Sequence, residues 1–244
     1  MRIGNGFLVT VARGLVAIGL SLAAIAPASA QTIINVTTGT SGTIGSGTTW
    51  NLIDGTPGGS ISANTTINGT LMFSRTSDVT VTNVLGGTTT TGQLVLSSTN
   101  TSTISLTNTN SFNGLTTISG GKLSLGNGGT TGSLASGTIQ IDSGKELIFN
   151  RGGTQLTHAG VIAGSGNITK AGSGVTALTG ANTNTGLLTV SAGTLAVGNA
   201  TTPGATGSIA NSTVQIDSGG RVRREHHRLR NVRQDRERHA HLHR

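Results

Sequence analysis

The feature that most constrains the fold of this chain is a period-two pattern of apolar and small polar residues, which glycine interrupts every few positions. The pattern is clearest over residues 160–199, and nothing there has the 3.6-residue period of a helix. Such alternation is typical of short strands that bury one face. The apolar positions are Ile168, Val175, Ala177, Leu188, Val190, Leu195 and Val197. The interruptions, which are turn signals, are Gly164, Gly166, Gly172, Gly174, Gly180, Gly186, Gly193 and Gly198.

The chain also repeats itself. Residues 114–126, GLTTISGGKLSLG, align without a gap with residues 186–198, GLLTVSAGTLAVG, at an offset of 72. Residues 137–145, GTIQIDSGK, match residues 212–220, STVQIDSGG, at an offset of 75. The extra residues fall in a loop with a Pro-Gly turn signal at 203–204. Repeats that keep their strands and vary their loops predict a solenoid, in which each copy buries its face against the next.

The composition suits a thin core. The 244 residues include 39 Gly, no Tyr and no Cys, and aromatic residues make up 2%. A compact domain of this size would fill its centre with aromatic side chains, whereas this chain relies on Val, Ile, Leu and Ala. We therefore expect an all-β protein without disulfides, an elongated β-solenoid of about eight turns with roughly 20 to 25 residues each.

The net charge of +8 is unevenly placed. Residues 1–30 contribute +2 and residues 31–220 are neutral, whereas residues 221–244 contribute +6 from nine Arg against three acids. A high pI usually indicates a nucleic-acid partner, but here it describes only the segment 221–244. We expect no specific nucleic-acid partner for the body of the chain.

Residues 1–30 have the layout of a secretory signal peptide and are predicted to form a signal helix. Arg2 and Arg13 supply the basic region, and residues 15–25 form an apolar run that is too short to span a bilayer comfortably. We expect export by Sec-type machinery, with an uncleaved membrane anchor as the alternative. The residues of the predicted A-x-A cleavage site and the first mature residue are Ala28, Ala30 and Gln31.

The chain between residues 31 and 220 divides into two parts. Residues 31–106 carry a degenerate version of the strand pattern, and residues 107–220 hold the clear repeats. Trp50 is interpreted as part of a cap over the first turn, because solenoid ends need covering; a ligand-stacking role is the alternative. Phe112 and Phe149 are interpreted as core residues.

Sequence motifs for catalysis are absent. There is no G-x-S-x-G, H-E-x-x-H, P-loop or G-x-G-x-x-G pattern, so we expect no catalytic, cofactor-binding or metal-binding residue and no enzyme activity. His158 is interpreted as an outward polar residue or a turn contact. Asp142 and Asp217, which recur in Gln-Ile-Asp-Ser-Gly, are interpreted as Asx-type turn residues whose carboxylates accept backbone N–H groups.

Residues 164–195 resemble the autotransporter-associated β-strand repeat, which is found in the passenger regions of bacterial type V secreted proteins. Asn184 stands where the family usually has Tyr, Phe112 takes that place in the earlier copy, and Leu187 stands where a second Gly is common. The resemblance is strong over residues 107–220 and weak before them. The matching residues are Gly164, Gly166, Lys170, Gly172, Gly174, Leu178, Thr179, Gly180, Asn182, Gly186, Thr189, Val190, Gly193 and Leu195.

The resemblance implies a right-handed parallel β-helix that is exported to the periplasm, outer membrane or cell surface of a Gram-negative bacterium. It also implies an outer-membrane β-barrel translocator in the same chain. A barrel needs many amphipathic strands that we do not find, so we interpret the chain as a truncated passenger. The expected function is that of a non-catalytic stalk or adhesin-like passenger fragment. The alternative is a solenoid-borne enzyme or carbohydrate-binding module, for which the longest candidate loop, residues 199–208, is short.

Residues 221–244 differ sharply from the repeats, because Gly, Thr and Ser give way to Arg and His. Three interpretations are open: a basic arm for nucleic acid or anionic lipid, a metal-binding tract with His239, His241 and His243 on one strand face, and a frameshift product. We favour the frameshift, which predicts a disordered tail. A last turn with an unpaired edge would also make the fragment self-associate or be degraded.

Overall fold

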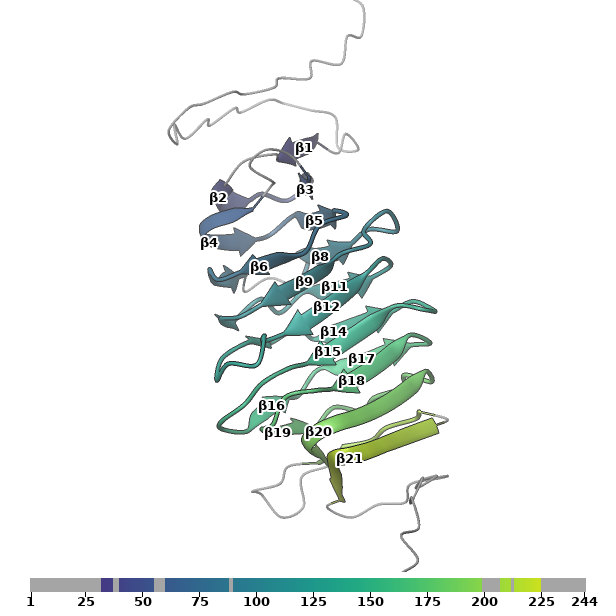
Figure 1. Ribbon diagram of the computed structural model, residues 1–244. Coiled ribbons are helices and arrows are strands. Elements are labelled where there is room, and N and C mark those ends of the chain that lie inside the picture. Colours follow the sequence, from purple (N-terminus) through teal and green to yellow (C-terminus); the bar gives the residue numbers. More distant parts are fainter. Residues whose placement is uncertain are drawn as a thin grey trace, which may run out of the picture. The chain divides into compact units, whose positions relative to one another are not determined.

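The computed structural model describes residues 32–36, 40–54, 60–87, 90–198, 207–211 and 213–224 (Figure 1). These residues form strands and turns, and the described ranges contain no helix. In chain order, the strands are β1 (Thr32–Val36), β2 (Thr40–Ile44), β3 (Thr48–Ile53), β4 (Ile61–Ile67), β5 (Thr70–Ser74), β6 (Val79–Val81), β7 (Leu85–Gly86), β8 (Gln93–Leu96), β9 (Thr103–Leu106), β10 (Thr109–Asn110), β11 (Leu115–Ile118), β12 (Lys122–Leu125), β13 (Ser133–Leu134), β14 (Thr138–Ile141), β15 (Glu146–Phe149), β16 (Leu156–His158), β17 (Val161–Gly164), β18 (Asn167–Lys170), β19 (Val175–Leu178), β20 (Leu187–Val197) and β21 (Thr213–Arg224).

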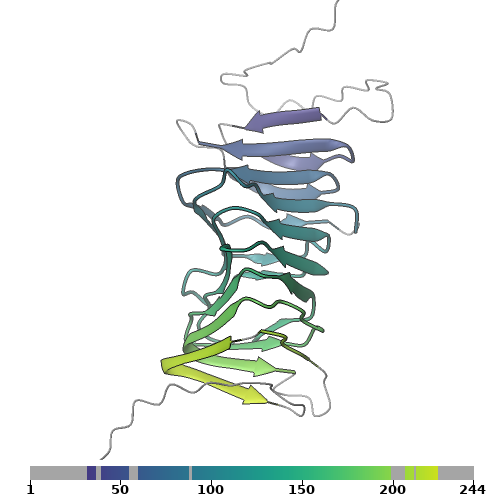
Figure 2. The same ribbon diagram turned by 90° about the vertical axis from the view of Figure 1, so that its right-hand side faces the viewer.

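The strands stack as successive turns of a solenoid with three faces (Figures 1 and 2). The seven-stranded sheet β1-β3-β5-β8-β11-β14-β17 forms the first face, and β6-β9-β12-β15-β18 lie along the second. The third face consists of shorter pieces, β2-β4-β7, β10-β13 and β16-β19. The long strand β20 joins two faces, because its first half pairs with β18 and its second half with β19, and β21 follows it. All these pairings are parallel, which confirms the expected parallel β-helix.

The register gives the length of a turn. On the first face Thr70 pairs with Gln93, Gln93 with Leu115 and Leu115 with Thr138. The spacing of these partners lies within the expected range of roughly 20 to 25 residues per turn. The seven-stranded sheet counts seven turns on that face, one fewer than expected from the sequence.

Inward side chains form continuous rows along the axis. On the first face Leu71, Leu94, Thr116, Ile139 and Ile162 are register partners in successive turns, and all are buried. The corresponding row on the second face is Ile104, Leu123, Leu147, Ile168 and Leu188. The expected core residues Phe112 and Phe149 are fully buried. A core that is only a few side chains wide explains why the chain needs so few aromatic residues.

The corners between faces depend on glycine in the left-handed region. Gly121 and Gly193, at equivalent places in the two sequence repeats, have φ of 56° and 68°. The next equivalent pair, Gly126 and Gly198, has φ of 89° and 95°. An L-residue with a side chain is strained at such angles, so the repeat encodes a strand, a corner and a second strand.

The two sequence repeats do not occupy the same faces. Leu115–Ile118 is β11 on the first face, whereas the aligned residues 187–190 are the part of β20 that pairs with β18 on the second face. Likewise Lys122–Leu125 lies on the second face and the aligned residues 194–197 pair with β19 on the third. The offset between the two repeats is therefore not a whole number of turns.

The structure tests several of the predictions made from the sequence. The strands expected within residues 31–106 are present, and Trp50 packs partly buried against the core. The first residues assigned to the basic tail belong to β21, where Val222 packs against the core and pairs with Leu195. The predicted signal peptide with Ala28, Ala30 and Gln31, and residues 225–244, lie outside the described residues. Among the described residues no helix is long and apolar enough to cross a membrane.

Candidate functional site

His158, which the sequence places on the surface or in a turn contact, is buried in the core, so that prediction was wrong. It is the last residue of β16 and only 2% exposed, and its register partner Leu178 is also buried. The ring lies 6.1 Å from the ring of Phe149, and Nδ1 is 3.3 Å from Leu134 O. Burial lowers the pKa of His158, which favours the neutral imidazole, and the ring packs as part of the core.

The recurring acids do not form a paired site. Asp142 follows β14, and its carboxylate accepts a hydrogen bond of 2.6 Å from Ser119 Oγ on the preceding turn. The turn itself is closed by the main-chain bond from Lys145 N to Asp142 O, which differs from the expected Asx turn. Asp217 lies in β21 and accepts from Gln215 Nε2 at 2.8 Å. Both carboxylates therefore serve local structure.

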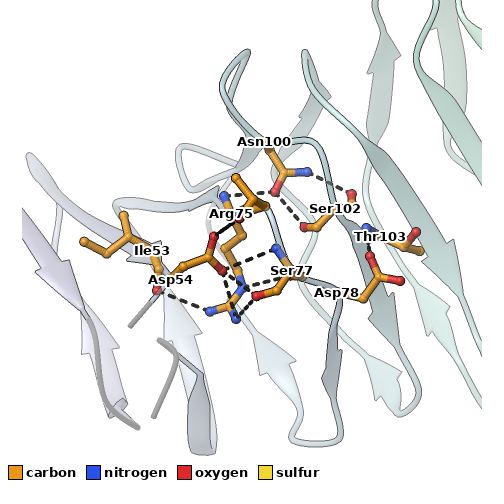
Figure 3. Close-up of polar contacts among 9 residues, drawn as sticks. Ile53, Asp54, Arg75, Ser77, Asp78, Asn100, Ser102 and Thr103 are labelled. Carbon is orange, nitrogen blue, oxygen red and sulfur yellow. Dashed lines mark hydrogen bonds and ion pairs between the residues drawn. The ribbon is translucent and has the colours of Figure 1, made fainter. Parts of the chain in front are cut away.

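A polar cluster joins the ends of β3 and β5 (Figure 3). The carboxylate of Asp54 accepts from Thr76 N and Thr76 Oγ1, both at 2.6 Å, and from Ser77 Oγ at 2.5 Å. Arg75 Nη2 lies 3.4 Å from Asp54 Oδ1, and Arg75 Nη1 donates to Ile53 O. The hydrogen bonds from Ser77 and then Thr76 hold the pKa of Asp54 well below its usual range. These contacts link the end of β3 to the residues that follow β5, so the cluster fastens two turns together.

Buried asparagines make bridges that each span three turns. Asn110 Oδ1 accepts from Leu85 N at 2.8 Å on the turn before, and its Nδ2 donates to Ser133 O at 2.8 Å on the turn after. Two further residues do the same: Asn100 links Arg75 N to Gly120 O, and Asn182 links Ile162 N to Ser208 O. Asn182 belongs to the repeat motif recognised in the sequence, but its bridging role was not predicted. The signal was available, because Asn110 and Asn182 align at the repeat offset of 72.

Lys170, another motif residue, is fully buried inside the second face. Its register partners are Phe149 on one side and Val190 on the other. Nζ donates to Gly172 O and, at 3.3 Å, to Ala192 O. Burial lowers the pKa of the Lys170 amine to about 8. The amine satisfies carbonyl groups in the corners of two successive turns, which is a structural role.

The exterior offers hydroxyl and amide groups and few charges. Among the outward register partners of the second face are Ser105, Thr169, Thr189 and Gln215. An ion pair of 2.8 Å joins Lys122 Nζ and Glu146 Oε2 on this face. Within the described ranges no group of three or more His, Asp or Glu could hold a metal ion.

Comparison with known proteins agrees with this architecture. The passenger-associated-transport-repeat family matches residues 99–125 and 168–197, that is, β9 to β12 and β18 to β20. The chain therefore carries the repeat of autotransporter passengers, as its sequence resemblance predicted. It is also similar to the adhesin BmaC autotransporter of Brucella suis biovar 1 (strain 1330), with 47% identity over 76 residues. That alignment covers 31% of this chain, and the chain spans only 2% of the length of that relative. No solved structure matches the chain.

Proposed function

We propose that this protein is an exported part of an autotransporter passenger that acts at the Gram-negative cell surface as a stalk or adhesin-like element without catalysis. One observation carries the proposal: passenger repeats lie within a parallel β-helix. The similarity to a protein named as an adhesin autotransporter supports it.

The architecture fits a spacer because length grows with each turn. Parallel strands stack about 4.8 Å apart, so every added turn on the first face extends the solenoid by one strand spacing. Each turn contacts mainly its neighbours, so turns add without a new core. Long faces of repeated hydroxyl groups suit multivalent contact with a surface.

The proposal includes the route to the surface. The chain would leave the cytoplasm through Sec-type machinery, with cleavage between Ala30 and Gln31, and would cross the outer membrane with a β-barrel translocator. N-terminal sequencing of the exported protein checks the first step: a mature chain that begins at Gln31 supports it. An exported chain that keeps the segment 1–30 would show an anchored form instead.

Surface display has a direct test. The full chain is expressed in a Gram-negative host in fusion to an outer-membrane β-barrel translocator, and intact cells are treated with protease and probed with an antibody against β-helix residues. We expect surface labelling that protease treatment of intact cells removes, together with increased binding of cells to host-matrix or bacterial surfaces. Cells carrying the translocator alone are the control. Retention of the folded chain in the periplasm would contradict the proposal.

The alternative is an enzyme or carbohydrate-binding module carried by the solenoid. The described corners offer no large insertion for such a module; the loop between β12 and β13, residues 126–132, is among the longer ones. The test is an activity assay of the purified chain, freed of contaminating enzymes. Substrate turnover in that assay would favour the enzyme over the non-catalytic stalk.

A further inference from the structure

The third face of the solenoid is interrupted between β13 and β16. β13 belongs to the two-stranded sheet β10-β13, whereas β16 is the first strand of a different sheet, in which it pairs with β19 (Figure 1). The two strands pack side by side in successive turns, but no strand ladder joins them. Main-chain bonds from Gly152 N to Gly129 O and from Val161 N to Gly137 O lie on either side of the interruption. We call the junction of Ser133–Leu134 with Leu156–His158 the β13/β16 seam.

The side chain of His158 lies across this seam. Nδ1 is 3.3 Å from Leu134 O on β13, and the ring packs 6.1 Å from the ring of Phe149. Because a carbonyl oxygen can only accept, the hydrogen bond requires the imidazole proton on Nδ1. The neutral side chain therefore supplies a contact between two strands that no ladder connects.

The second ring nitrogen has no partner. Nε2 is buried and accepts no hydrogen bond. A Cβ built on Gly160 would lie 3.1 Å from Nε2 and 2.0 Å from Ser136 O, so the main chain of this corner packs closely around the nitrogen. In the neutral ring Nε2 is an unused acceptor, whereas in the protonated ring it carries an N–H and part of the positive charge. A buried charged donor without an acceptor is costly, so protonation requires the corner to move and admit water.

The charged groups near His158 do not offset this cost. Among the described residues no carboxylate forms an ion pair with the ring. The strands β13 and β19 and the corner after β16 contain no ionisable residue. On β15, Glu146 is bonded to side chains of the outer face. Lys170 on β18 and Arg151 after β15 are cations that donate to corner carbonyls, and like charges oppose protonation of the ring.

We propose that His158 makes the β13/β16 seam sensitive to acid: the neutral imidazole holds the seam closed, and its protonation opens the seam locally. The ladders β11-β14-β17 and β12-β15-β18 pass the seam on the other two faces and contain no histidine, so the turns stay stacked there. A histidine that changes charge inside a packed contact is a known kind of pH switch. The inference does not rest on surface display, because its test uses the purified chain and its failure would leave the stalk proposal intact.

The direction of the pH effect follows from proton binding. Burial lowers the pKa of His158 in the folded protein from the ordinary value of 6.5. Below pH 6.5 the open seam therefore binds more protons than the closed seam, and opening is favoured as the pH falls. Above pH 6.5 both forms are neutral at His158, and this residue contributes no pH dependence.

The test is hydrogen exchange of the purified full chain, followed by mass spectrometry at pH 7.5 and pH 5, in wild type and in His158→Gln. Glutamine keeps an N–H that can donate to Leu134 O but does not titrate. Comparing the two proteins at the same pH cancels the intrinsic effect of pH on exchange. In peptides that contain β13 or β16, we expect the ratio of wild-type to variant exchange rates to rise on the order of tenfold from pH 7.5 to pH 5. The ratio in peptides of β5 and β8 should not change.

A second variant guards against loss of folding in the first. His158→Leu matches its apolar register partner Leu178 and lacks both ring nitrogens, so its seam should exchange with the same pH dependence as that of His158→Gln. A wild-type to variant ratio that is equal at both pH values would overturn the proposal. So would an acid-induced rise in the ratio that is the same in all peptides, since that result would show global unfolding.

The protonation of the ring can also be followed in wild type alone. The ¹³C-edited NMR signal of the His158 imidazole is assigned by its loss in His158→Gln. We expect the signal of the closed form to keep the shift of a neutral ring down to pH 5 while its intensity falls. A shift that titrates near pH 6.5 with undiminished protection of β13 and β16 would show a ring that is protonated in the closed seam, and the proposal would fail.

Discussion

Polar side chains occupy interior positions that carry aliphatic residues elsewhere in the solenoid. Asn100, Asn110 and Asn182 each join the turn before to the turn after, as a main-chain group would. Lys170 lies in register between the apolar residues Phe149 and Val190, and its amine donates to the carbonyl of Gly172 in a corner. At this scale the fold is held by buried polar groups that replace missing backbone partners at the corners, because a buried N–H or C=O without one is costly.

Replacing Asn110 with Ala should destabilise the protein strongly. The change strips Leu85 N and Ser133 O of their partners in the interior, and each orphaned group costs about 1–3 kcal/mol. We expect the free energy of unfolding, measured by urea denaturation, to fall by about 2–4 kcal/mol. Asn113→Ala, three positions away with an exposed side chain, is the control and should change it by less than about 0.5 kcal/mol. Equal effects of the two variants would refute the bridge.

The buried amine of Lys170 predicts a stability that rises with alkaline pH. Its pKa is about 8 in the folded protein, below the ordinary value of 10.5, so between these values the unfolded chain binds more protons than the folded one. Stability therefore increases as pH rises through this window, on the order of 1 kcal/mol per unit of pKa shift at most.

The measurement for Lys170 is the difference in unfolding free energy between wild type and Lys170→Met at pH 7, 8, 9 and 10. Subtraction cancels the other titrating groups. We expect the difference to move in favour of wild type above pH 8. A difference that stays flat with pH would show that the folded amine titrates as it does in the unfolded chain.

The sequence contained signals for some of these residues and not for others. Lys170 is two positions from Ile168, and His158 is two from Leu156, so period-two alternation places both polar residues inward. The prediction of an outward or turn position for His158 disregarded this alternation and was wrong. The partners of Asn110 lie far from it along the chain in both directions, and no local pattern reveals contacts that only the turn length creates.

At the scale of the element, the repeated unit consists of a strand, a glycine corner and a second strand. Its two copies lie on different faces of the solenoid. The strands and corners were predictable, because alternation and glycine positions are local. The face was not predictable, because it depends on how many residues the intervening loops consume. The corner of residues 119–121 between β11 and β12 and the equivalent corner 191–193 within β20 have the same length. The change of face therefore comes from the loops that lie between the two repeats.

The glycine that opens each repeat permits the close stacking of turns. A Cβ on Gly114 would lie 2.0 Å from Gly92 O and 2.6 Å from Cζ of Phe112, and the equivalent Gly186 meets Gly166 O at 2.0 Å. We expect Gly114→Ala to lower the unfolding free energy by more than about 3 kcal/mol, since backbone rather than a flexible side chain must move.

The control for Gly114 is Gly129→Ala, where the nearest atom to the new Cβ is 3.7 Å away. This change should alter thermal stability little, as monitored by circular dichroism at the β-sheet minimum. If both variants melted together with wild type, the turns would have to be more loosely stacked than the structure shows.

At the scale of the whole solenoid, stability is local, because each turn contacts its two neighbours and the turns at the ends have one. The first strand reflects this: Ile33 and Ile34 of β1 are 57% and 45% exposed. Inward residues of the middle strands β8 and β11, by contrast, are fully buried. We expect hydrogen exchange to be slowest in β8, β11 and β14 and to quicken toward β1 and β21.

Substitution of a middle turn distinguishes this behaviour from global cooperativity. In Gly114→Ala, hydrogen exchange followed by mass spectrometry should accelerate most in β8, β11 and β14, less in β18, and least in β1 and β3, since the disturbance weakens with each intervening turn. A uniform acceleration in all peptides would mean that the solenoid opens only as one unit. A graded response would mean that a passenger of this kind can lose one turn and keep the rest folded, because each ladder of parallel strands re-forms from the neighbour that remains.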